Sequence, residues 1–196
     1  VDLTGPSISF TALGNTASTA SRTMTASITD PSGVPTAGAG LPVLYWSVNS
    51  ATGPFTAATA THIGGSDYQF TIAATVTPND RVHYFIVAQD EIGTPNVSVT
   101  PVAGAASLTA NPPAAGTAPT TPNSYRIVNT ISGVVSVGTG QTFTSLTAND
   151  GGGLFRALND SLAASGNLEI EITSDLTETG AVALNQINEE GAGSYT

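Results

Sequence analysis

Short runs in which apolar and polar residues alternate occupy residues 1–102 of the chain, separated by clusters of Gly, Pro, Asn and Asp. Alternation places successive side chains on opposite faces of a β-strand, and turn signals at this spacing are typical of a β-sandwich. The sequence therefore predicts one β-sandwich domain over residues 1–102. Its expected strands are residues 7–11, 22–30, 41–49, 68–72, 81–90 and 97–101.

The alternating pattern stops between residues 103 and 124, where Pro, Ala and Thr dominate. Proline lacks the N–H group that a β-ladder needs, and closely spaced prolines stiffen an extended chain. We therefore expect residues 103–124 to be a linker rich in Pro, Ala and Thr. A loop packed along a domain surface is an equally good interpretation of this composition.

A third pattern, over residues 125–196, predicts a β-rich segment with one short helix. The glycine-rich turn at 149–153 precedes four apolar residues at helical spacing: Leu154, Phe155, Leu158 and Leu162. Strands are expected at residues 134–137, 142–146 and 168–173. The chain stops in mid-pattern at Thr196, so we expect this segment to be incomplete and the chain to be a piece of a longer protein.

Missing residue types exclude most familiar catalytic chemistry. The 196 residues include four arginines, fourteen carboxylates, two histidines, no lysine and no cysteine, with a net charge of −10. Without Cys there are no disulfides, thiolate metal sites or cysteine nucleophile, and without Lys there is no phosphate-binding loop or Schiff base. We expect the chain not to be an enzyme and to use no cofactor.

The same charge balance narrows the choice of partners. Affinity for nucleic acid and for anionic lipid rests on clusters of basic residues, which four isolated arginines do not form. No run of about twenty apolar residues occurs, so we expect no membrane insertion. The abundance of Thr, Ser, Ala and Gly, with no lysine, fits an exported protein.

The run Arg81-Val-His-Tyr-Phe-Ile-Val-Ala-Gln-Asp-Glu-Ile-Gly93 resembles the penultimate strand of fibronectin type III and related immunoglobulin-like domains. In that family the tyrosine that matches Tyr84 is buried, and its hydroxyl ties down the adjacent loop. The resemblance implies an immunoglobulin-like β-sandwich for about half the chain. It implies little about function, because such folds host many functions.

The second half is similar to the opening segment of right-handed parallel β-helix regions. The likeness is carried by residues 136–146, by the glycine-led helix after them, and by residues 166–176. Such regions occur in large secreted, adhesin-like surface proteins of Bacteroidota-type bacteria, after an immunoglobulin-like domain and a Pro/Thr linker. The resemblance implies type IX secretion, although the chain has no C-terminal sorting domain. An open solenoid end exposes apolar surface, which further sequence or a neighbouring subunit would cover.

Alternation also predicts an apolar patch on the outer face of the sandwich. Tyr84 and Trp46 are expected on two strands that are neighbours in the sheet. If both residues point into the core, the residues that alternate with core positions on these two strands point outward. Those residues are Val43, Tyr45, Phe85 and Val87. Patches of this kind mark contacts, so we expect this face to pack against the linker, the second segment or another subunit.

Acidic residues provide the remaining candidate chemistry. Glu169 and Glu171 lie on one face of a strand, about 6.7 Å apart by strand rise, a separation that inverting glycosidases use. A solvated outer face is the far more common role of such a pair. Asp90–Glu91 and Asn149-Asp150-Gly151 offer oxygen ligands for calcium, although turn and cap roles are by far the more common explanation of such residues. Calcium is therefore the one metal considered, as a minor alternative to no metal.

Several short motifs have simple structural interpretations. Residues 138–143 contain two of the three glycines of a dinucleotide fingerprint and are expected to form a turn. Asn96-Val-Ser and Asn159-Asp-Ser match glycosylation acceptor patterns, and Asp160-Ser-Leu resembles a short O-glycosylation motif. His83 is expected on the sheet surface.

The leading hypothesis is a non-enzymatic structural or adhesive module of a bacterial extracellular surface protein. Its expected partners are neighbouring domains or other copies of itself, in a filament or layer, with surface glycans as an alternative partner. The rival hypothesis is the N-terminal accessory portion of a secreted β-helix enzyme that acts on carbohydrates. An enzyme would carry clustered Asp, Glu or Arg in later coils, whereas an adhesin would carry repeats.

Overall fold

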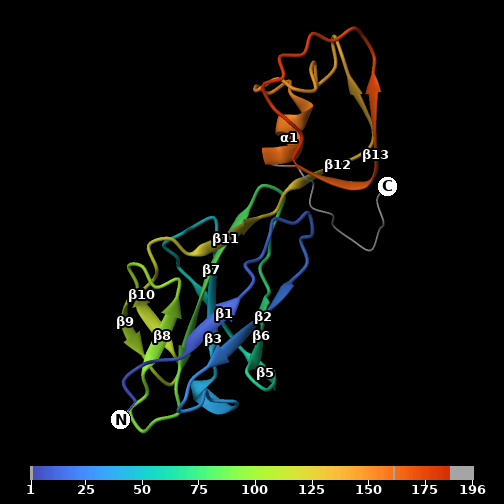
Figure 1. Ribbon diagram of the computed structural model, residues 1–196. Coiled ribbons are helices and arrows are strands. Elements are labelled where there is room, and N and C mark those ends of the chain that lie inside the picture. The colour runs from blue at the N-terminus through green and yellow to red at the C-terminus, as the bar shows by residue number, and fades with distance from the viewer. Residues whose placement is uncertain (1, 161, 186–196) are drawn as a thin grey trace. The chain divides into compact units, whose positions relative to one another are not determined.

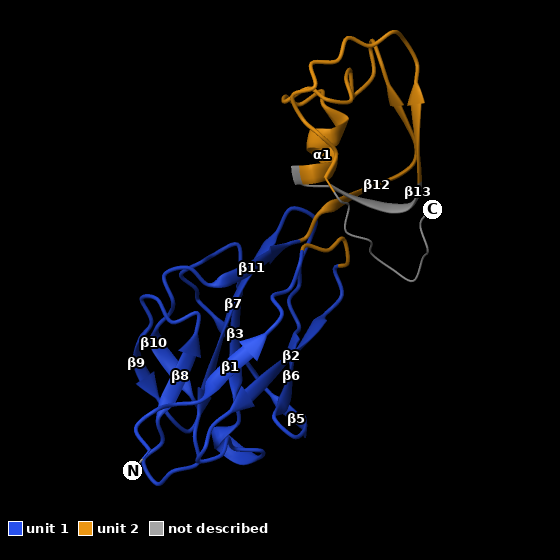
Figure 2. Ribbon diagram, in the orientation of Figure 1, with its two compact units in different colours: residues 1–14, 19–126 blue, residues 15–18, 127–196 orange. Residues whose placement is uncertain are grey.

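The computed structural model describes residues 2–160 and 162–185 and divides the chain into two compact units (Figures 1 and 2). Unit 1 comprises residues 1–14 and 19–126, and unit 2 comprises residues 15–18 and 127–196. Nearly all regular structure is β-strand, so the fold is all-β with one short α-helix. Within the described ranges, no helix is both long and apolar enough to span a membrane.

The first sheet of unit 1 has four antiparallel strands. In spatial order they are β1 (Ser7–Phe10), β2 (Arg22–Thr29), β6 (Asp67–Ile72) and β5 (Thr61–Gly64). Burial alternates along β2 and β6, as expected for strands with one face in the core. The inward residues of β6, Tyr68, Phe70 and Ile72, are each at most 1% exposed.

The second sheet is built around β7 (Arg81–Gln89), the predicted strongest strand. On one side β7 pairs with β3 (Val43–Val48), which in turn pairs with β4 (Thr56–Thr59). Its other edge is shared: β11 (Asn123–Arg126) pairs with its first half and β8 (Val97–Thr100) with its second half. A short 3-10 helix, η1 (Gly38–Gly40), precedes β3.

The core of unit 1 contains inward side chains of both sheets. Phe10 of the first sheet and Tyr84 of the second bring their rings to 6.3 Å. Val82, Tyr84, Ile86 and Ala88 are fully buried on β7, as the alternation predicted. Trp46 is only partly buried.

The predicted linker is part of unit 1, so that prediction is wrong. Residues 103–124 contain β9 (Ala106–Thr109) and β10 (Ala114–Thr117), which form an antiparallel hairpin, and the start of β11. The prolines do not interfere, because Pro112 and Pro113 occupy the hairpin turn and Pro119 and Pro122 lie between strands. The boundary between the two units accordingly follows Arg126.

Unit 2 contains β12 (Asn129–Val137), α1 (Leu154–Asp160) and β13 (Leu162–Ile172). The two strands pair in parallel, with Val135 opposite Ile170 and Val137 opposite Ile172. Val137, Leu154 and Leu158 form the buried centre of the unit. Leu162 begins β13 and does not continue the helix, contrary to the helical spacing.

Residues 142–146 form no strand, which corrects another expectation. Only Phe143 and Ser145 make isolated parallel bridges, to Val137 and Gly153. Residues 15–18 belong to this unit because Thr16 bridges Ile127 and accepts a hydrogen bond from the Val128 N–H. This attachment joins residues that are far apart in sequence and was not predicted.

The chain of unit 2 winds back along its own path at a nearly constant sequence offset. Thr173 donates to Val137, 36 residues earlier, and Thr139 donates to Ser174, 35 residues later. Ser145 donates to Glu178 across 33 residues, and Gly180 donates to Thr147 across 33. The described part of unit 2 therefore makes one full coil and begins a second.

Candidate functional site

Three carboxylates converge in unit 1. Asp2 comes from the N-terminal segment, Asp30 from the turn after β2, and Asp90 from the residue after β7. One carboxylate oxygen from each lies within 4.8 Å of the others, and Asp90 is fully buried. Within the described ranges this is the one group of three or more Asp, Glu, His or Cys residues close enough to share a metal ion.

Hydrogen-bond donors hold each of these carboxylates in place. Asp2 accepts from the Thr4 N–H at 3.0 Å and from the Ser32 hydroxyl at 2.7 Å. Asp30 accepts from the Ser32 N–H at 2.7 Å. Asp90 accepts from the backbone N–H of Asn96 at 2.9 Å and from its side-chain amide at 2.7 Å. These hydrogen bonds therefore help to hold together the three chain segments that carry the carboxylates.

These bonds also explain the acidity of Asp2. The Ser32 hydroxyl, followed by the Thr4 N–H and hydroxyl, lowers the pKa of the Asp2 carboxyl from 3.8 to about 2. Hydrogen bonds to a carboxylate favour its charged form, whereas desolvation disfavours it. The hydrogen bonds outweigh the desolvation here, and Asp2 is ionised at neutral pH.

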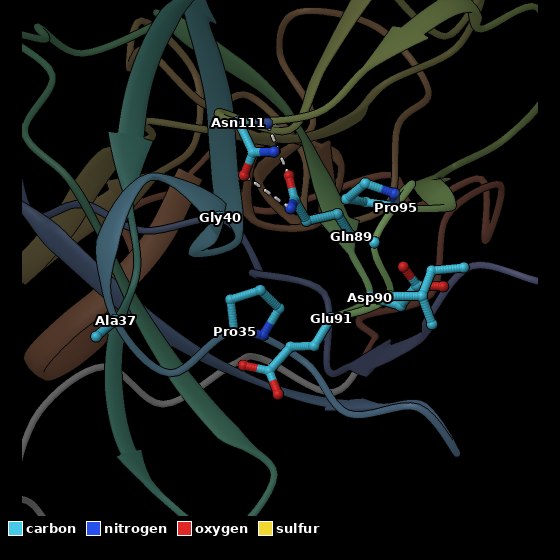
Figure 3. Close-up of a pocket in the computed structure, with 10 residues that line it drawn as sticks. Pro35, Ala37, Gly40, Gln89, Asp90, Glu91, Pro95 and Asn111 are labelled. Atoms are coloured by element: carbon cyan, nitrogen blue, oxygen red, sulfur yellow. Dashed lines mark hydrogen bonds between the residues drawn. The ribbon is translucent and has the colours of Figure 1, made fainter.

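A polar pocket of 460 Å³ shares Asp90 with this cluster (Figure 3). Its walls include Pro35, Pro95, Glu91 and the amide pair of Gln89 and Asn111. Gln89, only 2% exposed, accepts from the Asn111 backbone N–H at 2.8 Å and donates to the Asn111 side-chain oxygen at 3.0 Å. A second pocket, of 480 Å³, is lined partly by Asp30 and Thr4.

Oxygen ligands of this kind suit a hard divalent cation such as calcium. Of the predicted calcium ligands, Asp90 lies in the three-carboxylate cluster, while Glu91 is exposed and lines the pocket. Asp150 accepts a hydrogen bond from the Gly152 N–H at 2.9 Å, which is the predicted turn role. The geometry of the cluster permits cation binding, and its hydrogen bonds satisfy the carboxylates without an ion.

The predicted apolar patch is assembled as expected but is covered within unit 1. Val43, Phe85 and Val87 are at most 2% exposed, and Tyr45 is partly buried. Tyr45 stacks on Phe85 with ring centroids 5.2 Å apart. The cover comes from Val99 of β8 and from small residues of the former linker: Ala105, Ala115 and Ala118.

One hydrogen bond fixes the hairpin over this patch. The Tyr45 hydroxyl donates to the Pro113 carbonyl at 3.1 Å, across the turn between β9 and β10. The segment that covers the patch is thus the predicted linker, which was one of the three partners expected for this face. The four residues present little surface to another subunit.

The acidic pair of β13 belongs to unit 2, whereas the carboxylate cluster belongs to unit 1. Glu169 and Glu171 are exposed, and Glu171 accepts from the Ser136 hydroxyl at 3.1 Å. Neither residue lines the two pockets described above. This is the arrangement of a solvated outer face.

The remaining motifs have structural roles. Residues 138–143 form a turn in which the Gln141 N–H bonds to the Gly138 carbonyl. The Asn96 side chain bonds Asp90, and that of Asn159 bonds the Ala183 carbonyl at 2.7 Å. Ser161, in the second and third glycosylation motifs, lies outside the described residues. His83 is partly exposed, and burial followed by the charge of Arg81 lowers its pKa.

Sequence reasoning missed two polar sites. Asp2 and Asp30 are each followed two residues later by a hydroxyl residue, a pattern that predicts local turns but not their meeting. Glu178 carried no signal at all, yet it accepts from Ser145, Thr147 and the backbone N–H of Leu146. These donors, led by Thr147, lower its pKa from 4.5 to about 2.

No protein-family model matches the chain, and no curated protein is similar to it.

Proposed function

We propose that the chain is a non-enzymatic structural or adhesive module of a secreted protein on a bacterial cell surface. Unit 1 would serve as an immunoglobulin-like or fibronectin III-like sandwich, and unit 2 as the first coil of a parallel β-helix. The strand order β1-β2-β6-β5 in one sheet and β4-β3-β7, with β8 and β11, in the other supports the first part. Neighbouring domains or other copies would be its partners.

The observation that carries the proposal is the winding of unit 2. Hydrogen bonds join segments 31 to 36 residues apart along the coil, from Thr147–Glu178 to Val137–Thr173. Repeated stacking of this kind builds elongated structures in which each coil contacts only its neighbours. Such structures present modules at a distance from the cell and join others by packing and strand pairing.

Binding to cells and surfaces tests the proposal. The purified chain is expected to be retained on bacterial cells or glycan-coated surfaces, or to assemble with rising concentration in sedimentation and electron microscopy. A monomer at every concentration that binds neither cells nor glycans would overturn it. Release of reducing ends from a polysaccharide would overturn it in favour of an enzyme.

A variant of the patch controls for unfolding. Phe85→Ala removes a buried ring and is expected to expose apolar residues of unit 1. Binding that appears only in this variant would therefore come from exposed core residues and not from adhesion. Ile63→Ala changes a side chain that is 51% exposed. Binding of equal strength by the native chain and by this variant supports the proposal.

A further inference from the structure

The β9–β10 hairpin has few backbone links to the rest of unit 1. β9 and β10 pair with each other, in a two-stranded sheet of their own (Figure 1). Among the residues that the structure describes, no backbone hydrogen bond joins residues 104–119 to either large sheet. A hairpin of two strands is marginally stable in water by itself. The hairpin therefore depends on side-chain contacts with the surface beneath it.

Side chains hold the hairpin at its turn and along one strand. The Tyr45 hydroxyl donates to the Pro113 carbonyl, and Gln89 makes two hydrogen bonds with Asn111 (Figure 3). Three alanines of the segment pack on the apolar patch: Ala105, Ala115 and Ala118. Because alanine buries little apolar area, these contacts contribute less than large side chains would. The hairpin is thus held more weakly than the strands of the two large sheets.

The base of the hairpin is closed, so the segment can move as one unit. The Thr120 N–H donates to the Ala103 carbonyl at 2.8 Å, which brings the two ends of the segment together. Residues 101–105 link β8 to β9, and residues 118–122 link β10 to β11. Gly104, in the first link, has a φ of 80°, a conformation that favours glycine. Links of this length absorb changes of φ and ψ, and five extended residues reach about 17 Å.

The hairpin covers an aromatic surface. The centroid of the Phe85 ring lies 5.2 Å from that of Tyr45 and 5.0 Å from that of Phe55. If the hairpin moved away, these rings would face water, and apolar patches of this kind mark contacts. The surface that fits them is the hairpin itself, with its small side chains and its carbonyl for the Tyr45 hydroxyl. Every other copy of the chain carries the same hairpin.

We infer that residues 104–119 are a detachable cover that also docks on the apolar patch of a second copy of the chain. The contacts with the patch are the same in both cases, and only the two links change, which makes such an exchange a low-cost route to association. Reciprocal exchange gives a closed dimer, and successive exchange gives an open chain of copies. This inference rests on the proposed structural function, because it names the way in which other copies become partners.

Thiol labelling tests whether the hairpin detaches by itself. The chain has no cysteine, so an introduced thiol reports on one position. Val87 and Ala88 are neighbours on β7 and are both fully buried, Val87 under the hairpin and Ala88 in the core between the sheets. We expect Val87→Cys to react with a thiol reagent at least about tenfold faster than Ala88→Cys. Low concentrations of denaturant should accelerate the reaction of Ala88→Cys more steeply, because it needs a larger opening.

Cross-linking between copies tests the exchange. Chains with Gln89→Cys are mixed at high concentration with mass-tagged chains with Asn111→Cys, diluted, and treated with a short thiol cross-linker. The two native side chains lie 3.0 Å apart, so an exchanged hairpin brings the thiols of two copies together. Ile63→Cys in place of Gln89→Cys measures chance encounters, because Ile63 is 51% exposed. Val99→Cys with Ala115→Cys repeats the test at a second contact between the patch and the hairpin.

We expect tagged–untagged cross-links to exceed the Ile63→Cys control at least about tenfold, and to increase with the concentration of mixing, because a second copy competes with the chain's own hairpin. Cross-linking no greater than the control at every concentration would overturn the inference. So would equal labelling of Val87→Cys and Ala88→Cys with the same dependence on denaturant, since the hairpin would then leave only when all of unit 1 unfolds.

The outcome for the proposed function is separate. If hairpins do not exchange and the intact chain still adheres or assembles, the inference fails and the proposed function stands. If hairpins exchange in a chain that releases reducing ends from a polysaccharide, the proposed function fails and the exchange stands.

Discussion

The hydroxyl of Tyr84 accepts a hydrogen bond from the backbone N–H of Leu13 at 2.9 Å, across 71 residues of sequence. Tyr84 is fully buried on β7, and its ring lies 6.3 Å from those of Phe10 and Tyr125. The bond ties the segment after β1 to the centre of the second sheet. The fibronectin III resemblance implied that this hydroxyl ties down the adjacent loop, whereas it bonds a segment near the start of the chain.

Tyr84→Phe removes this bond and keeps the ring. We expect a loss of about 1–2 kcal/mol in the free energy of unfolding, because the Leu13 N–H must find another acceptor. Chemical denaturation of the native chain and the variant measures the loss, and hydrogen exchange at Leu13 shows whether it is local. Native stability together with a still-protected Leu13 amide would contradict the assigned role.

Phe85→Ala tests whether the predicted patch is core or surface. Phe85 contacts Tyr45 and, edge-on at 5.0 Å, Phe55, beneath the cover of the β9–β10 hairpin. Loss of a buried phenylalanine costs about 3–5 kcal/mol, and the same substitution on an open face costs far less. Ile63→Ala is the exposed control, with an expected cost below about 0.5 kcal/mol. Equal costs for the two variants would mean that the hairpin does not cover Phe85.

Asn111→Gly tests the bond between the hairpin turn and β7. Asn111 has a φ of 57°, which glycine adopts without strain, so this substitution removes only the side chain. The Gln89 amide then loses its acceptor while nearly buried, and we expect a destabilisation of about 1–2 kcal/mol. A double-mutant cycle with Gln89→Leu measures the coupling. Additive effects would show that the two amides contribute independently.

Unit 2 is expected to loosen in acid because of Glu178. Its folded-state pKa of about 2 lies below the usual value of 4.5, so the unfolded chain binds the proton more readily. The stabilisation is present above pH 4.5 and is lost as the pH falls toward 2. After correction for the pH dependence of intrinsic amide exchange, the protection of the Leu146 and Thr147 amides should fall over this range.

Glu178→Gln provides the control for that pH dependence. The variant keeps a hydrogen-bond acceptor but lacks the charge, so faster exchange at Leu146 and Thr147 should already be present at neutral pH. Glu171→Gln, which removes an exposed carboxylate from β13, should leave these amides unaffected. An acid-induced change that survives in Glu178→Gln would have to come from another group.

Local pattern predicted much of the fold because it reports how a strand divides its side chains between core and solvent. The alternation from Arg81 to Asp90 located β7 and its buried face, and the same logic grouped Val43, Tyr45, Phe85 and Val87. The helix at 154–160 followed from the spacing of Leu154 and Leu158. Each of these features depends on residues close together in sequence.

Composition misled where a segment gains its order from distant partners. Residues 103–124 looked like a linker because of their prolines and small side chains. In unit 1 those small side chains are what allow the β9–β10 hairpin to lie against Phe85 and Val87. Nothing within the segment itself reveals the apolar surface that it covers.

The sequence by itself determined the β character of the chain, the inward faces of its main strands and the exclusion of cysteine and lysine chemistry. Only the tertiary structure decided which segment covers the apolar patch and that Asp2, Asp30 and Asp90 meet. It also decided that Glu178 is held by a loop 31 to 33 residues earlier. The reason is physical: periodicity encodes which side of a strand faces the core, whereas contacts between distant segments depend on how the whole chain closes on itself.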